Sequence, residues 1–242
     1  MSLLHRKAKR MSGLLQASVV WQLLFWCACA KQQQSLEAPV SMTHSTPQTY
    51  RAQREDAYLQ LRVELTVTET EIDLVYQAVA RPSMELVLLD ALWQFLPSGQ
   101  EIPAPELAFA SFVKPETLVL HRSVPALPTA KNVERAYLPW CRVLRPGEPL
   151  QGHIKLPVPT LESSPYYPHH SRAVYRTEQA HQIELHLEYR LKEQLGSMSP
   201  IVAVPGVLSC ELGASPPHEL RTVLKLTQPL PVRRRSDQFE PV

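Results

Sequence analysis

Apolar and polar side chains alternate along two long stretches of the chain. Residues 59–67 and 183–191 each place an aliphatic or aromatic side chain at every second position, with polar residues between them. A period of two gathers the apolar residues on one face of a strand, whereas a helix would spread them around its surface. Both segments are therefore predicted to be strands with one buried and one exposed face.

Further strands are predicted in the segments between turn signals. They cover 72–79, 84–93, 117–124, 152–158, 201–208 and 219–227. Helical periodicity is weak everywhere, with 49–57 as the one candidate. Apart from 117–124, the proline-rich segment 97–130 is expected to form loops or edge strands, and the prolines from Pro157 to Pro168 frame a long loop that ends near Ser171. The pattern predicts an all-β fold, an antiparallel immunoglobulin-like or related β-sandwich of about eight strands with long Pro-rich loops.

The first 30 residues differ from the rest of the chain. Four basic residues lie within 6–10, no acidic residue precedes Glu37, and an apolar run covers 14–30. This layout is typical of a secretory signal. The run is shorter and more interrupted than the roughly 20 apolar residues of a spanning helix, although an uncleaved N-terminal anchor is an alternative. Residues 1–30 are predicted to be a signal peptide or lipoprotein signal.

Two processing routes fit the end of this run. Ala28 and Ala30 are the small residues that an ordinary signal peptidase prefers, here before Lys31. Cys29 after Ala28 also resembles a bacterial lipoprotein signal, in which the cysteine becomes the lipidated first residue, although Trp26 replaces the usual aliphatic residue. We favour Cys29 as the lipid attachment site. The protein would then be exported and periplasmic, or anchored to the outer membrane of a bacterial envelope.

Composition separates a linker and a tail from the domain. The polar segment 31–49 is predicted to be a linker, 50–232 the β-sandwich domain and 233–242 a flexible tail. The chain has 25 basic and 23 acidic residues, and four of the basic ones lie in the signal, so the domain is slightly acidic. Arg233–Arg235 is the one basic cluster outside the signal, so nucleic acid is not an expected partner.

Cysteine placement predicts a disulfide. Cys27 and Cys29 fall in the signal, which leaves Cys141 and Cys210 in the exported domain. Two such thiols often pair in an oxidising compartment. The alternative is a pair of buried free cysteines, since the sequence does not show whether their Cα atoms approach each other.

The sequence contains no motif of a catalytic or cofactor site. His169, His170, His181 and His186 lie close together, yet their spacing matches no zinc motif. On a strand, His181 and His186 point to opposite faces, with His186 between two glutamates on the exposed face. No metal and no cofactor is therefore expected. A nucleophile elbow is missing as well, so an active site would need residues distant in sequence.

One loop has the composition of a contact surface. Tyr166, Tyr167, His169 and His170 lie in a proline-rich segment, and tyrosine supplies contact area at low entropic cost. Alternatively, the tyrosines hold the loop against its own core. We predict an exported envelope (lipo)protein that acts as a non-enzymatic binding or scaffolding module for an unknown envelope protein or polymer, attached to the membrane through its N-terminal segment. The alternative is a hydrolase or metal-binding domain whose site is assembled from sequence-distant residues.

Overall fold

The computed structural model describes residues 46–96, 98–114, 116–125, 127, 137–167, 174–202 and 204–236. All of them belong to one unit, His44–Val242. They form fifteen strands and one 3-10 helix, η1 (Lys192–Gln194), and contain no α-helix. The all-β prediction is confirmed, whereas the expected number of about eight strands is wrong. None of the described helices has the length and hydrophobicity that a membrane span requires.

Four antiparallel strands form the first sheet. In spatial order they are β1 (Gln48–Glu55), β2 (Leu59–Val67), β3 (Glu71–Ala80) and β10 (Pro149–Pro157). The apolar side chains of β2 are buried at every second position, at Leu59, Leu61, Val63 and Leu65. The predicted period of two therefore sets which face of this sheet enters the core.

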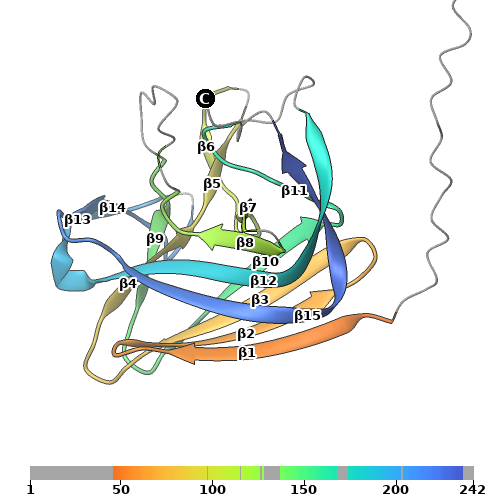
Figure 1. The fold of residues 1–242 in the computed structure, drawn as a ribbon. Helices are drawn as coiled ribbons and strands as arrows, with labels where there is room; N and C mark the ends of the chain where they lie inside the picture. The colour runs from red at the N-terminus through yellow and green to blue at the C-terminus, as the bar shows by residue number, and fades with distance from the viewer. Residues whose placement is uncertain are drawn as a thin grey trace, which may run out of the picture. The chain divides into compact units, whose positions relative to one another are not determined.

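The second sheet is larger and is built around two long strands. Its main path runs β11 (Thr160–Leu161), β15 (His218–Arg235), β12 (Tyr175–Leu191), β4 (Leu86–Ala91), β9 (Trp140–Leu144), β14 (Leu208–Leu212) and β13 (Leu195–Pro200). A hairpin of β7 (Phe109–Lys114) and β8 (Thr117–Arg122) joins it, because β8 pairs in parallel with β12. Figure 1 shows β12 and β15 side by side.

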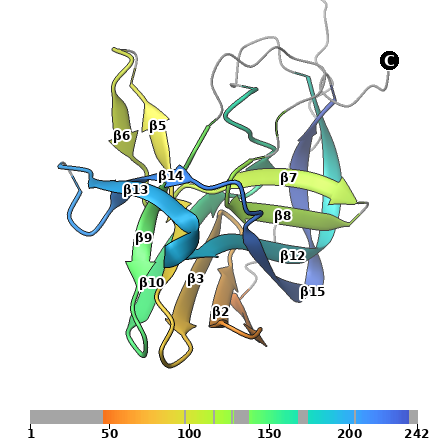
Figure 2. The ribbon, with the colours of Figure 1, turned by 90° about the vertical axis from the view of Figure 1, so that its left-hand side faces the viewer.

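The two sheets enclose one main hydrophobic core. It combines inward side chains of the first sheet, such as Leu61 and Leu74, with those of the second sheet, such as Leu120 and Leu185. Sheets that pack through their apolar faces in this way make a sandwich-like fold. Two hairpins extend it, β13–β14 and the separate pair β5 (Trp93–Phe95) and β6 (Glu101–Pro103). Figure 2 shows both hairpins on the side that carries β9.

Several predicted boundaries differ from the structure. Segment 201–208 is mostly a turn between β13 and β14, because Pro205 and Gly206 interrupt the apolar run that favoured a strand. Segment 49–57, the weak helix candidate, lies largely in β1. Arg233–Arg235, which the sequence places in the tail, continues β15 and pairs with the start of β12.

Candidate functional site

A fully buried carboxylate, Asp90 on β4, lies at the centre of a hydrogen-bonded network between the two sheets. Tyr76 on β3 donates its hydroxyl to Asp90 Oδ2 at 2.5 Å. Arg142 on β9 donates Nε to Asp90 Oδ1 at 2.9 Å, and a second guanidinium nitrogen bonds to Oδ2. Bidentate, charge-assisted pairs of this kind are among the strongest hydrogen bonds in proteins. Asp90 therefore connects β3 to β4 and β9.

A second guanidinium lies beside this network. Arg122 on β8 is only 2% exposed. It donates to the backbone oxygen of Asp90 at 3.1 Å and to those of Pro105 and His153. Its Nε is buried, and no described residue accepts a hydrogen bond from it. This buried cation therefore has more donors than the described residues around it have acceptors.

Gly152 makes room for the tyrosine of the network. It lies opposite Tyr76 in the β3–β10 register. A Cβ atom at Gly152 would overlap the ring and hydroxyl of Tyr76. The absence of a side chain on this residue of β10 allows Tyr76 to reach Asp90.

The environment fixes the charge of each group. Burial alone would raise the pKa of Asp90, but the bonds and charge of Arg142, together with Arg122, outweigh it, and the pKa is lowered. Burial is the largest cause that raises the pKa of Tyr76. Burial would lower the pKa of Arg142, yet its bonds to Asp90 raise it. At neutral pH the network therefore holds one carboxylate, two guanidinium groups and one neutral hydroxyl.

This network forms the polar part of a cavity of about 590 Å³. Prolines and valines of segments 103–105 and 204–207 line it together with Trp140. His153 and Glu106 also line the cavity, with His153 Nδ1 3.3 Å from Glu106 Oε1 and His153 Nε2 2.7 Å from Asp73 Oδ1. Pockets for small organic ligands have this size and this combination of apolar walls with a few convergent polar groups.

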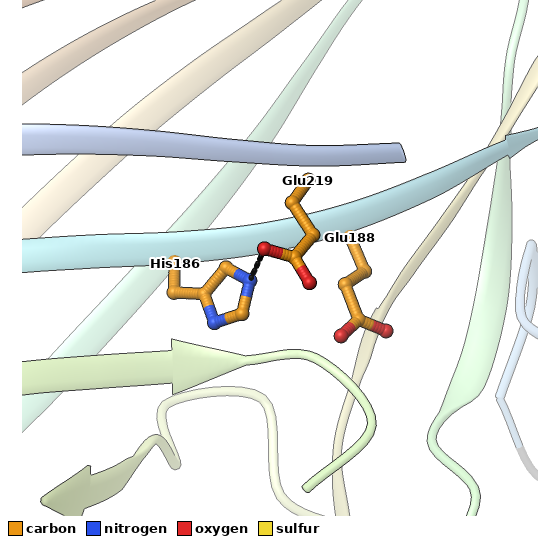
Figure 3. Close-up of side chains that lie close together, drawn as sticks. All are labelled: His186, Glu188 and Glu219. Carbon is orange, nitrogen blue, oxygen red and sulfur yellow. Dashed lines mark ion pairs between the residues drawn. The ribbon is translucent and has the colours of Figure 1, made fainter. Parts of the chain in front are cut away.

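A second polar cluster lies on the other face of the larger sheet. His186 and Glu188 on β12 and Glu219 on β15 place possible ligand atoms within 4.8 Å of one another. Figure 3 shows the three side chains pointing toward one another, with His186 Nε2 3.6 Å from Glu219 Oε2. His186 is 7% exposed and Glu188 is 5% exposed. The prediction that His186 lies on an exposed face is therefore wrong.

Two further side chains extend this cluster across the sheet. His186 Nδ1 lies 3.2 Å from Nδ1 of His121 on β8, whose Nε2 lies 2.7 Å from Ser111 Oγ on β7. Burial is the largest cause that lowers the pKa of His121 to about 4. Burial also lowers the pKa of His186, and Arg221 adds to the effect. Both imidazoles are therefore neutral at pH 7, the form in which histidine ligates metal ions.

The structure places the predicted site residues as follows. Cys141 and Cys210 are joined in a disulfide with Cα atoms 6.5 Å apart. Tyr166 packs against an apolar cluster around Trp93 and accepts a hydrogen bond from the backbone N–H of Tyr137 at 3.0 Å. This tyrosine thus helps to hold its own loop.

Of the other four predicted site residues, the structure describes only Tyr167. Tyr167 is partly buried, and its backbone oxygen accepts a bond from Arg235 at 3.0 Å. Cys29, His169 and His170 lie outside the described residues.

Comparisons with protein-family models, with curated proteins and with solved structures find no match to this chain. Function must therefore be inferred from the chemistry of the cavity and of the polar cluster. Neither was identified from the sequence, although a charged residue inside the apolar segment 84–93 was a usable signal for Asp90. Buried charges require partners.

Proposed function

We propose that the protein is an exported, non-enzymatic binding domain that holds a small organic anion with an apolar body. The observation that carries this proposal is the cavity of about 590 Å³, whose apolar walls meet Asp90, Arg122 and Arg142. Two guanidinium groups face the buried carboxylate of Asp90. Glu106, the other acidic residue of the lining, is 54% exposed and faces His153, so the buried polar end carries an excess positive charge. An anionic group of a ligand would balance that charge, and proline, valine and tryptophan would contact its apolar part.

Binding is favoured over catalysis by the composition of the cavity. The described residues that line it include no serine, cysteine, threonine or lysine. Ser111 and His121 form the kind of pair that a hydrolase uses, but neither residue lines this space. The groups of the network are also hydrogen-bonded to one another, which suits a fixed binding surface.

The remaining parts of the proposal concern location and partners. We place the domain in a bacterial envelope, attached through lipid on Cys29 by a linker, with an immunoglobulin-like sandwich as the underlying fold. The apolar run at 14–30 and the polar segment after it support export. The loop with Tyr166, Tyr167, His169 and His170 is the proposed contact for an envelope protein or polymer.

The fluorescent organic anion anilinonaphthalene sulfonate tests the cavity directly. We expect it to bind the full chain at one site and to be displaced by decanoate but not by decanol, because only decanoate supplies the negative charge. Val75→Trp should weaken binding at least about 10-fold, since Val75 lines the cavity and is 43% exposed. Val223→Trp is the matched control, because Val223 is 44% exposed and does not line the cavity.

Two results would contradict the proposal. Equal affinity in both tryptophan variants would show that the probe binds elsewhere on the domain. Equal displacement by decanoate and decanol would show that the cavity does not select a charge. Circular dichroism of each variant checks that the β-fold is retained.

A further inference from the structure

The second polar cluster has the geometry of a metal site. His186, Glu188 and Glu219 come from the neighbouring strands β12 and β15, and their ligand atoms lie within 4.8 Å of one another (Figure 3). Ligands on Zn²⁺ at about 2.1 Å stand about 3.4 Å apart in a tetrahedral arrangement. The observed 3.6 Å between His186 Nε2 and Glu219 Oε2 is close to that separation.

The imidazole of His186 supplies an independent observation. Its Nδ1 faces His121 at 3.2 Å. Its Nε2 is buried, is directed at the two carboxylates, and forms no hydrogen bond with any described residue. Buried polar atoms in native proteins are normally satisfied, and each exception requires an explanation, of which a bound ion is one. A cation between the three side chains would satisfy this nitrogen.

The two carboxylates need a cation for a different reason. Glu188 and Glu219 stand directly opposite each other in the β12–β15 register, and Glu188 is 5% exposed. Like charges in this position repel. Arg221 compensates only part of this charge. It bonds to Glu219 at 2.7 Å, but its side chain is 56% exposed to solvent. The backbone N–H of Val124 gives Glu188 one further donor, at 3.2 Å.

We propose that His186 Nε2, Glu188 and Glu219 bind Zn²⁺, with His121 and Ser111 holding the imidazole in position. One imidazole with two carboxylates is a ligand set that zinc accepts. Nδ1 of a zinc-bound histidine normally donates to a neighbour that fixes its orientation, and His121 occupies that place. Three protein ligands leave a fourth position for water or for a group from a partner.

Isothermal titration of the metal-stripped full chain with ZnCl₂ tests the site. Imidazole and thiol groups in general bind zinc, so the comparison between variants is the readout. Glu219→Gln should weaken the tightest site at least about 100-fold, because it removes a charged ligand without a change of shape. Glu184→Gln is the matched control, since Glu184 lies two residues before His186 on β12, contacts Arg221 and is outside the cluster.

Ser111→Ala should weaken the same site by about 10-fold, as outer hydrogen-bond partners of metal ligands commonly do. Substitution with Co²⁺ should give the intense visible absorption of a four-coordinate ion in the wild type and in Glu184→Gln, and should lose it in His186→Ala. Retention of the tightest site in Glu219→Gln, or no zinc binding by the wild type, would overturn the proposal. If His186→Ala fails to fold, Glu219→Gln decides, because that side chain is 45% exposed.

Discussion

Replacing Asp90 by asparagine should destabilise the domain more than any surface charge change. The substitution keeps the shape of the side chain but removes the negative charge that Arg142 and Arg122 face. Asp90 is fully buried, while the Arg142 side chain is only 23% exposed. The variant would therefore leave a largely buried guanidinium without its counter-ion.

The size of the effect follows from that burial. Breaking a buried ion pair by removal of one partner costs about 3–5 kcal/mol. A domain of this kind has a free energy of unfolding of about 5–15 kcal/mol, so Asp90→Asn should fold but melt about 10 °C lower. Asp73→Asn is the matched control: Asp73 pairs with His153 at 2.7 Å, but both side chains are more than one third exposed. Exposed pairs contribute about 1 kcal/mol or less.

The pH dependence has a defined sign. Arg142 and Arg122 hold the pKa of Asp90 below its ordinary value despite burial. The carboxylate therefore stabilises the folded state fully above its unfolded pKa of about 4, and that contribution is lost as the pH falls through the lower folded pKa. The difference between wild type and Asp90→Asn should be largest near pH 7 and should shrink below pH about 4.

Urea unfolding, monitored by circular dichroism at several pH values, measures these differences. The reasoning fails if Asp90→Asn loses no more free energy of unfolding at pH 7 than Asp73→Asn does. It also fails if the loss stays constant down to the lowest pH at which the wild type remains folded.

The other predictions address packing, the disulfide and the anchor. Gly152→Ala should cost about 1–3 kcal/mol of unfolding free energy, because its Cβ would displace Tyr76 from Asp90; urea unfolding measures this, and an unchanged midpoint argues against it. Replacing Cys141 and Cys210 by serine should lower the free energy of unfolding by about 4 kcal/mol, because the disulfide joins cysteines 69 residues apart. Two titratable thiols in the native protein would exclude the bond. Cys29→Ser should abolish incorporation of a fatty-acid analogue; persistent label would exclude that cysteine.

The alternation of apolar and polar residues predicted the longest strands, because a strand with one buried and one exposed face shows a period of two in its sequence. Residues 59–67 form β2 with the expected face buried. The second half of β12 departs from this rule, since its residues from Leu185 to Arg190 are buried on both faces. Short strands such as β5, β6 and β11 span too few residues for any period to be detected.

The polar sites were harder to predict because their burial depends on non-local pairing. Glu184, His186 and Glu188 alternate with apolar residues, which is typical of a solvent-exposed face. The parallel pairing of β8 with β12 brings His121 against His186, and sequence gives no signal for that register. Asp90 interrupts an apolar strand and Arg122 ends one, so their burial could have been suspected, but their common contact could not.

The proline-rich segment 97–130 contributes to both sites, although outside the predicted strand 117–124 the sequence indicates only loops or edge strands there. The backbone oxygen of Pro105 accepts a bond from Arg122 beside the cavity. Val124 donates its backbone N–H to Glu188 at 3.2 Å in the polar cluster. Proline fixes φ and cannot donate to a sheet ladder. Pro105 and Val124, which precedes Pro125, lie outside the strands and contribute backbone groups to side chains instead. The backbone groups of Pro105 and Val124 therefore supply partners to two buried charged side chains, Arg122 and Glu188.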